Sequence, residues 1–483
     1  MNDFESALEK TQEYGIIQEI KLQLVTVSGL PHAKPNELVV FYNNTLGQVF
    51  SIQEDTVKIL LLSQTSLKVG ERVARTNEFL SIPVDESLLG SVIDPLGHSI
   101  FSSHTRIPQS SEEIEKEVLG MTKRKKIKKT FHTGVTLVDL MIPLAKGQRE
   151  LIIGDRKTGK SSFLLTVAQR QVQEGSVVIY AAIGRKKNEI KKLYELFQKQ
   201  NVMSQVVIVA SDHQSPASIV YLTPYTAMSV AEYFRSQGRD SVVILDDLST
   251  HAKYYRELSL LAGNFPGRDS YPGDIFYKHA HLLERAGNFI GDNDTEVSIT
   301  CLPVAETVEG DMTGYITTNL MGMTDGHIYF DSGIFSLGMR PAINIPLSVT
   351  RVGNQVQTTL KKELHNEIRT LLTKYERLLM YSHFGAELSS AIQKTLINGE
   401  KIYTVFNQHY ETPIPEAVQL YLMGLWWSGA FEKNTKDEII ALKDAVTAKY
   451  ETATGKKHLD ALLTISSLTD LGKTVKQIQE ALT

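Results

Sequence analysis

The sequence predicts a multidomain α/β protein that begins with a β-barrel, continues with a parallel-sheet domain and ends with a helical domain. Three observations lead to this prediction: short strand patterns before residue 93, longer apolar runs at helix-length spacing after residue 130, and helical periodicity after residue 357. A chain of 483 residues needs more than one core, since single cores stop growing near roughly 250 to 300 residues. We expect domains over residues 1–93, 94–357 and 358–483.

The barrel is predicted from the first of these segments, where apolar and polar side chains alternate. Ile20, Leu22 and Leu24 are separated by polar residues, and glycine, proline and asparagine residues supply the turns. Short strands of this kind favour a barrel, because closure removes exposed edges. A short leading arm precedes the first strand.

The central domain is predicted from apolar runs without alternation, as expected for parallel strands buried on both faces. These runs are Leu151–Ile153, Val177–Ile183, Val206–Ala210, Val242–Leu245 and Val297–Leu302. After residue 357 strand patterns end, and Leu360, Leu364 and Ile368 begin a series at helical spacing. The rest of the chain is therefore predicted to be helical.

The segment from residue 110 to residue 130 changes from acidic to strongly basic. We expect a linker or a solvated surface there. The basic run Lys123 to Lys129 would also suit a local contact with acidic protein or nucleic acid, but a solvated loop is the simpler interpretation.

The overall composition excludes several classes of protein. With 42% hydrophobic residues, 22% charged residues and a net charge of −4, nothing points to nucleic acid or anionic lipid as the main partner. The single cysteine, Cys301, cannot form an internal disulfide, and the sequence contains neither a secretory signal nor an apolar run of about 18 residues. We expect a cytoplasmic protein that reaches a membrane only through partners.

The strongest motif is a phosphate-binding loop between the predicted strand Leu151–Ile153 and a helix. It fits G-x-x-x-x-G-K-[ST] and comprises Gly154, Asp155, Arg156, Lys157, Thr158, Gly159, Lys160 and Ser161, with Ser162 following. The glycines let backbone N–H groups face phosphates, and the helix presents its positive end. Lys160 would reach the outer phosphates, and the Ser161 hydroxyl would bind Mg²⁺.

A second strand, Val242–Leu245, ends in Asp246 and Asp247. Ligands bind at the carboxyl ends of parallel strands, and an aspartate there can hold a magnesium-bound water. With the loop, this predicts Asp246 as a metal ligand beside Ser161, and ATP or ADP with Mg²⁺ as cofactor. Asp247 is predicted to be structural, since strands often end in an aspartate that caps a helix.

Several long segments resemble the alpha subunits of F-type ATP synthases. They are IPLAKGQRELIIGDRKTGKSS, VVILDDLSTHAKYYRELSLL, PGRDSYPGDIFYKHAHLLERAG, TDGHIYF and GMRPAINIPLSVTRVGNQVQ. The resemblance covers residues 16–432 and is closer to alpha than to beta subunits in the loop and at the LDDLS strand end. It implies a RecA-like nucleotide domain in the centre of the chain. It also implies a hexamer of three alpha-type and three beta-type subunits around a central-stalk gamma-type subunit, with a peripheral-stalk subunit and no nucleic acid.

One position predicts that this chain does not hydrolyse nucleotide at its own site. Catalytic beta subunits end the strand after the loop helix in Gly-Glu-Arg, and that glutamate polarises the attacking water. Here the strand reads YAAIGRKKNE, with Arg185 in place of the carboxylate. A guanidinium cannot act as the base, and Glu189 is the alternative carboxylate. Whether the chain is itself an enzyme stays open.

Alpha subunits usually carry glutamine where this chain has Lys157 and Arg185. We therefore expect two added positive charges near the phosphates and firm retention of a magnesium nucleotide. The alternative is that both side chains point to solvent.

The resemblance assigns two further sites. Arg351, in SVTRVG, corresponds to an arginine finger that reaches the neighbouring beta-type site in trans and stabilises the transferring phosphoryl group; a surface salt bridge is the alternative. On the adenine side, Gln408 is kept from a Gln-x-Gln pair and Tyr410 replaces the second glutamine. Tyr410 would stack on the base or simply pack against the protein.

Other classes fit less well. A Rho-like RNA helicase lacks a long helical domain with the segment FGAELSSAIQ, and a self-sufficient secretion-type ATPase needs the carboxylate that Arg185 replaces. Within the family, a specialised motor that is not coupled to ATP synthesis, such as one driving bacterial gliding motility, stays an alternative to a synthase. Either would lie at the inner face of the cell membrane through its complex.

Overall fold

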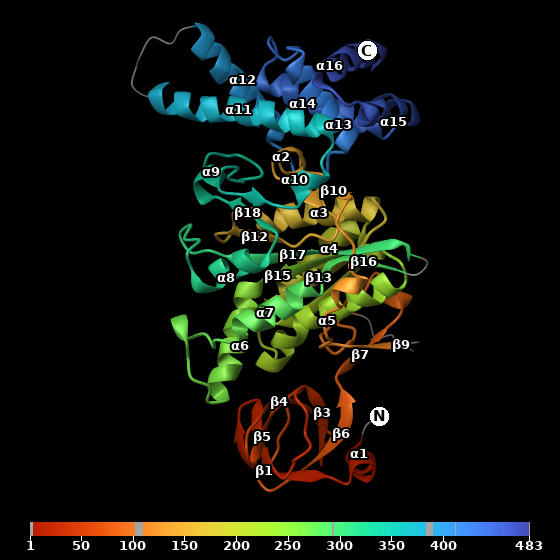
Figure 1. The fold of residues 1–483 in the computed structure, drawn as a ribbon, viewed down its shortest axis with the longest axis vertical. Helices are drawn as coiled ribbons and strands as arrows, with labels where there is room; N and C mark the ends of the chain where they lie inside the picture. The colour runs from red at the N-terminus through yellow and green to blue at the C-terminus, as the bar shows by residue number, and fades with distance from the viewer. Residues whose placement is uncertain (1–2, 102–109, 292–293, 383–389, 411, 483) are drawn as a thin grey trace. The chain divides into compact units, whose positions relative to one another are not determined.

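The computed structural model describes residues 3–101, 110–291, 294–382, 390–410 and 412–482 (Figure 1). The chain forms two compact units. The first comprises Met1–Lys125, Gly175–Glu306 and Asp311–Thr324, and the second comprises Lys126–Glu174, Thr307–Gly310 and Asp325–Thr483. The limits of the three predicted domains stay predictions. Residues 384–389 of the segment FGAELSSAIQ lie outside the described residues.

A closed antiparallel barrel in the first unit confirms the predicted β-barrel. Its strands, in the order β1-β2-β5-β4-β3-β6, are β1 (Tyr14–Lys21), β2 (Leu24–Ser28), β3 (Glu37–Phe41), β4 (Leu46–Ile52), β5 (Thr56–Leu61) and β6 (Arg72–Phe79). Ile17, Val39 and Ile59 lie fully buried in its core, since alternate side chains of each strand face inward. Helix α1 (Phe4–Thr11) packs on β6.

The alternation predicted through Leu22 is wrong at that residue. β1 ends at Lys21, and Leu22 takes φ 54° and is exposed, whereas Leu24 is buried in β2. Leu22 therefore belongs to the tight turn that joins β1 and β2, and its hydrophobicity carries no information about the core.

A parallel sheet forms the rest of the first unit and confirms four of the predicted strands. Its order is β17-β15-β13-β14-β8, with strands β8 (Val92–Ile93), β13 (Val177–Arg185), β14 (Val206–Asp212), β15 (Ser241–Asp246) and β17 (Glu296–Glu306). Strand β16 (Gly287–Ile290) pairs antiparallel with β17, and β7 (Ser81–Val84) pairs with β9 (Ser110–Glu113). The carboxyl ends of β13, β14 and β15 meet at one edge, because the strands run in register.

Helices cover this sheet. They are α4 (Lys187–Lys199), α5 (Ala217–Ser236), α6 (Leu248–Leu261), α7 (Ile275–Glu284) and α8 (Tyr315–Met323). Helix α5 packs on β13, β14 and β15 and is buried over most of its length, as expected for a helix that is apolar on all sides.

In the second unit, three strands of the sheet lie side by side in the order β19-β18-β12. Strand β12 (Glu150–Gly154) is parallel to β18 (Gly326–Phe330), and β19 (Val349–Thr350) is antiparallel to β18. Strands β10 (Thr130–Phe131) and β11 (Leu144–Ala145) form a separate pair. The associated helices are α2 (Thr136–Met141), α3 (Lys160–Gln173), α9 (Ser332–Ser336) and α10 (Gly353–Val356).

The end of the second unit is helical, as predicted. Its helices are α11 (Thr359–Ser382), α12 (Ser390–Phe406), α13 (Glu416–Trp427), α14 (Lys436–Tyr450), α15 (Ala453–Asp460) and α16 (Leu468–Leu482). Helix α13 is the most deeply buried of them and contacts α14, α15 and α16.

The basic run is not wholly a solvated loop. Arg124 donates to the Ala286 carbonyl oxygen at 3.0 Å and lies over the Phe289 ring, and Lys125 pairs with Asp294 at 3.0 Å. The solvated interpretation is therefore wrong for Arg124 and Lys125, because the Ala286 carbonyl group before β16, the Phe289 ring in β16 and the Asp294 carboxylate after it are partners that a sequence pattern cannot place.

Across the described ranges, no helix combines the length and the apolar character needed to cross a bilayer.

Candidate functional site

The phosphate-binding loop lies in the second unit between β12 and α3, as predicted. Gly154 and Gly159 have φ values of 150° and 100°, which residues with a Cβ rarely adopt. A Cβ on Gly154 would lie 2.4 Å from the carbonyl oxygen of Phe330 in β18. Both glycines are therefore needed for the backbone path of the loop.

Lys160 begins α3 and folds back over the loop. Its Nζ donates to the carbonyl oxygens of Gly154 and Asp155 at 2.7 and 2.6 Å. The side chain is buried, so the ammonium group is held inside the turn that the loop makes.

Asp155 fixes the loop from outside. Its Oδ1 accepts from Thr307 Oγ1 at 2.6 Å and from the Gly310 N–H at 3.0 Å. Its carbonyl oxygen also accepts from Thr158 Oγ1 at 2.8 Å. Asp155 therefore acts as a structural residue of the loop.

The other loop residues differ in exposure. Arg156, Lys157 and Ser161 are exposed, and Ser162 is half-buried in the first turn of α3. Lys157 has φ 63°, in the left-handed region that few residues with a Cβ adopt. The contribution of Lys157 to phosphate binding stays a prediction.

A charged cluster fixes the far end of α3. His132 lies 2.8 Å from Glu174 through Nδ1 and 3.0 Å from Glu416 through Nε2. Arg170 pairs with Glu174 at 2.8 Å, and Lys361 pairs with Glu416 at 2.5 Å. Although burial acts in the opposite direction, the two carboxylates raise the pKa of His132 to about 9. His132 is therefore a cation at neutral pH.

Gln408 is buried and its amide has partners within the protein. Nε2 donates to the carbonyl oxygens of Gly134 and Thr412 at 2.7 and 2.9 Å, and Oε1 accepts from the Thr136 N–H at 3.2 Å. The amide holds the segment before α13 in place, so a contact with adenine would have to displace these bonds.

Tyr410 is positioned by the helix that follows the loop. Its carbonyl oxygen accepts from Thr166 Oγ1 of α3, and its side chain is 42% exposed. The exposed ring is compatible with stacking, which stays a prediction.

Two residues beside the loop, Phe335 and Arg340, were not predicted from the sequence. A Cβ on Gly159 would lie 4.0 Å from the Phe335 ring, and Arg340 stacks on that ring with Cζ 3.5 Å from its centroid. The Gln408 N–H donates to the Arg340 carbonyl oxygen at 2.7 Å. Arg340 is the arginine of the GMRPAIN segment and Phe335 lies three residues before that segment, but an aromatic residue and an arginine at this spacing carry no motif signal.

Arg351 follows β19 and its side chain is exposed. Its backbone N–H donates to the Asp325 carbonyl oxygen at 3.2 Å, while the Asp325 carboxylate pairs with Arg149 at 2.9 Å. Within the described part of the chain, no hydrogen bond or ion pair is found for the Arg351 guanidinium, and its charge acts to lower the pKa of the buried Glu150 and of His327. The alternative of a surface salt bridge therefore gains no support.

In the first unit, Arg185 and Asp246 contact each other at the carboxyl ends of β13 and β15. Arg185 Nη2 lies 2.5 Å from Asp246 Oδ1, and the Tyr180 hydroxyl donates to Asp246 Oδ2 at 2.7 Å. Both carboxylate oxygens of Asp246 therefore have a protein partner. The sequence predicted both residues for a ligand site but gave no sign that they would bond to each other.

Asp247 has the structural role predicted for it. Its carboxylate caps α6, accepting from the Thr250 N–H at 2.6 Å and from Thr250 Oγ1 at 3.1 Å. Burial and the charge of Asp246 raise the pKa of Asp247 to about 6. Glu189, the alternative catalytic carboxylate, is exposed in the first turn of α4.

The surroundings of Asp246 do not fit the magnesium role predicted for it. Mg²⁺ needs oxygen ligands in near-octahedral geometry, whereas a permanently charged guanidinium lies within hydrogen-bonding distance of this carboxylate. Among the described residues, no group of three or more His, Cys, Asp or Glu side chains could hold a metal ion. Magnesium binding by Ser161 and Asp246 stays a prediction, and Ser161 is exposed.

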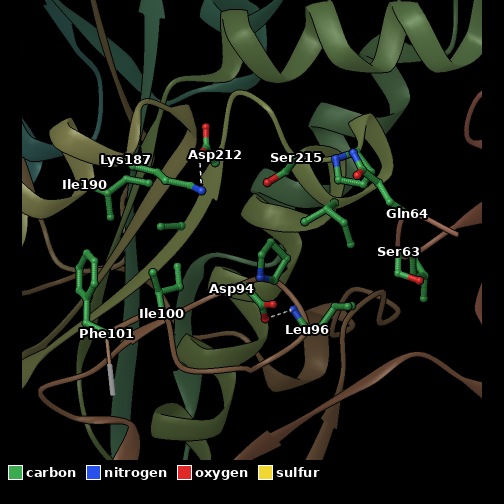
Figure 2. Close-up of a pocket in the computed structure, with 15 residues that line it drawn as sticks. Ser63, Gln64, Asp94, Leu96, Ile100, Phe101, Lys187, Ile190, Asp212 and Ser215 are labelled. Atoms are coloured by element: carbon green, nitrogen blue, oxygen red, sulfur yellow. Dashed lines mark hydrogen bonds and ion pairs between the residues drawn. The ribbon is translucent and has the colours of Figure 1, made fainter. Parts of the chain in front are cut away.

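A pocket of about 490 Å³ in the first unit includes none of the predicted site residues (Figure 2). It lies at the carboxyl ends of β8 and β14 and is lined mainly by apolar side chains, Ile100 and Ile190 among them. At its rim Lys187 lies 3.6 Å from Asp212. The charged rim groups therefore pair with each other instead of converging on a common point.

Comparison with known proteins gives two family matches. The ATP synthase alpha/beta family, nucleotide-binding domain, matches residues 134–350, and the ATP synthase alpha/beta chain, C terminal domain, matches residues 357–483. The ATP synthase subunit alpha of Aquifex aeolicus is 38% identical over 424 residues, covering 88% of this chain and 84% of the relative. The subunits of the same name from Neorickettsia sennetsu and Petrotoga mobilis are 37% and 36% identical, over 87% and 89% of this chain and 84% and 86% of the relatives.

Proposed function

The chain belongs to the ATP synthase alpha/beta family as an alpha subunit, and on that premise we propose that it is a nucleotide-binding, non-hydrolysing subunit of a hexameric rotary ATPase. Three alpha-type and three beta-type subunits would surround a central-stalk gamma-type subunit, with a peripheral-stalk subunit attached. Contact with the cell membrane would run through that complex.

The observation that carries the proposal is the phosphate-binding loop. Backbone N–H groups and the positive end of α3 favour a phosphate at this position, and Lys160 supplies a charge that strengthens the hydrogen bonds. ATP or ADP is the ligand that such a loop suits. The exposed ring of Tyr410 and the Phe335 ring are candidates for contact with its base.

Arg185 supports the absence of hydrolysis at this chain's own site. It occupies the position at which a catalytic subunit has its glutamate, and a guanidinium cannot accept a proton from water. Although burial acts against it, the charges of Asp246 and Asp247 raise the pKa of Arg185 above its ordinary value. Glu189 points to solvent from α4 and is a poor substitute.

Arg351 is proposed to act in the site of a neighbouring beta-type subunit. Its side chain is exposed and has no ion pair among the described residues. A long cationic side chain of this kind suits insertion into a partner's site, where it would stabilise negative charge on the transferring phosphoryl group.

The proposal is tested with the assembled complex and the full chain. Arg351→Lys should lower ATP turnover of the complex by about 10³-fold, the lower end of the range for arginine fingers. Nucleotide bound by the full chain alone should not change, because Arg351 would serve a different site. Arg369→Lys, an exposed arginine of α11, is the matched control and should leave turnover intact.

Two outcomes would contradict the proposal. Full turnover with Arg351→Lys would remove the role in trans. Substantial ATPase activity of the purified chain without a beta-type partner would overturn the non-hydrolysing assignment.

Co-purification identifies the complex to which the chain belongs. Delta, epsilon and membrane-sector subunits would indicate a synthase, and unfamiliar stalk proteins would indicate a dedicated motor.

A further inference from the structure

Glu150, the first residue of β12, is a buried acid that the proposed function does not use. Its side chain is fully buried, and its Oε2 accepts from Gln148 Nε2 at 2.6 Å. Among the described residues, Oε1 has no hydrogen-bond partner. A carboxylate is costly to bury unless a cation or several donors compensate its charge, and one amide donor does not do so.

The fold brings this carboxyl group beside the strand that leads to Arg351. Glu150 pairs with Gly326 of β18 (Figure 1), and Gly326 pairs in turn with Thr350 of β19. A Cβ on Gly326 would lie 2.6 and 2.9 Å from the two carboxyl oxygens of Glu150, and closer still to the Val349 carbonyl oxygen of β19. The missing side chain at position 326 therefore leaves the space that the carboxyl group needs next to β19.

Two charges act on the Glu150 carboxyl group, those of Asp325 and Arg351. Asp325 pairs with Arg149 at 2.9 Å, so its charge is largely compensated. For the exposed Arg351 guanidinium, no hydrogen bond or ion pair is found within the described ranges. Arg351 is therefore the nearby cation that a charge on Glu150 would attract.

Burial raises the pKa of Glu150 well above its ordinary value, against the opposing effects of the Gln148 hydrogen bond and the Arg351 charge. The other titratable side chain of β18 at this place, His327, does not compete for the proton. Burial lowers the pKa of His327, and its Nε2 lies 2.9 Å from the Leu347 carbonyl oxygen. Above neutral pH, His327 is therefore uncharged.

We propose that Glu150 is a positioning residue for Arg351, which it leaves free as a neutral acid and draws onto its own chain as a carboxylate. The proposal rests on the role in trans proposed for Arg351 and adds control of that role by one proton. With the proton on Glu150, the guanidinium stays exposed and can reach a neighbouring subunit. When the proton is lost to solvent at high pH, the buried carboxylate needs a cation, and Arg351 is withdrawn.

Modification of arginine by phenylglyoxal in the full chain tests the proposal. The rates at Arg351 and Arg369 are measured in the same sample by mass spectrometry of peptides. Arg369 is an exposed arginine of α11, and it corrects for the pH dependence of the reagent. Between about pH 7 and about pH 10, the ratio of modification at Arg351 to that at Arg369 should fall at least about threefold, because the Glu150 carboxylate holds the guanidinium.

Glu150→Gln keeps the shape of the neutral acid but cannot ionise. In this variant the ratio should stay constant with pH. Because His132 titrates over the same range, the comparison with the unaltered chain isolates the contribution of Glu150. Glu367→Gln, an exposed glutamate of α11, is the matched control and should show the same fall as the unaltered chain. In the assembled complex, the loss of ATP turnover at alkaline pH should be smaller with Glu150→Gln than with the unaltered chain.

The outcomes separate the two proposals. A ratio that does not change with pH in the unaltered chain would refute the control by Glu150, and this measurement requires no variant to fold. A fall of equal size in Glu150→Gln would refute it as well, since another group would then hold Arg351. If the ratio falls as expected but Arg351→Lys leaves turnover of the complex intact, the capture of Arg351 by Glu150 is supported and only the role in trans is lost.

Discussion

The phosphate-binding loop of the second unit and the carboxyl ends of β13 and β15 in the first unit each hold one charged side chain, but by different means. Lys160 donates to two backbone carbonyl groups of its own loop, whereas Arg185 donates to the carboxylate of Asp246. A carbonyl group can lose a donor to an anionic ligand at small cost, but a buried carboxylate that loses its guanidinium keeps an unpaired charge. The loop is therefore suited to exchange partners with a ligand, and the strand ends are suited to stay as they are.

The largest expected effect concerns how α3, the helix behind the loop, is held. His132 has a pKa of about 9 in the folded chain against 6.5 as an ordinary histidine. Its stabilising charge is fully present below pH 6.5 and is lost as the pH rises through about 9. The free energy of unfolding should fall by up to roughly 3 kcal/mol over this interval.

Denaturation of the chain and of His132→Gln at pH values across this window measures the effect. The variant should lack most of the decline. His98→Gln is the control, since His98 pairs with Asp94 at the surface and is 75% exposed. If the free energy of unfolding depends on pH equally in the unaltered chain and in His132→Gln, the ion pairs of His132 do not stabilise α3.

The next effect tests whether the loop exchanges partners with a ligand. Lys160→Met should weaken ATP binding by about 100-fold, because a charge-assisted hydrogen bond to phosphate is lost. Its denaturation midpoint should change little, since the carbonyl groups of Gly154 and Asp155 can lose a donor at small cost. Lys157→Met, at an exposed position of the same loop, should cost no more than a few-fold in affinity. A large loss of stability with Lys160→Met would contradict the comparison.

The smallest effect is expected for the Arg185–Asp246 pair at the carboxyl ends of β13 and β15. It concerns the free energy of unfolding and not ligand binding. Asp246→Asn keeps the shape of the side chain but leaves the Arg185 charge without its closest partner. Because Arg185 is 30% exposed, we expect a loss of about 2 kcal/mol, below the value for a fully buried pair. The double variant with Arg185→Gln should recover part of this loss. A neutral effect of Asp246→Asn in chemical denaturation would show that the pair is dispensable.

Much of the molecule could be predicted from local patterns. The apolar runs at Val177, Val206 and Val242 became β13, β14 and β15 because continuous hydrophobicity in a short segment is typical of a buried parallel strand. The loop could be recognised because glycine is needed at fixed positions for positive φ. Asp247 could be recognised because capping depends on residues only three positions away.

Predictions were weaker wherever a side chain met a distant partner. Arg124 belonged to a basic run that resembled a solvated loop, yet it bonds to a carbonyl group far along the chain. The contact of Gln408 with adenine stays a prediction, and the sequence gives no sign that its amide bonds to Gly134, Thr136 and Thr412. Neither pattern contains information on which acceptors the fold brings near.

The sequence by itself determined the fold class, the phosphate-binding loop and the absence of a carboxylate at position 185, because each depends on residue type and local spacing. Only the tertiary structure decided what the charged side chains do. Arg185 and Asp246 are 61 residues apart and become partners because β13 and β15 are adjacent and parallel in register. Pairing energy depends on distance and burial, and strand order sets both.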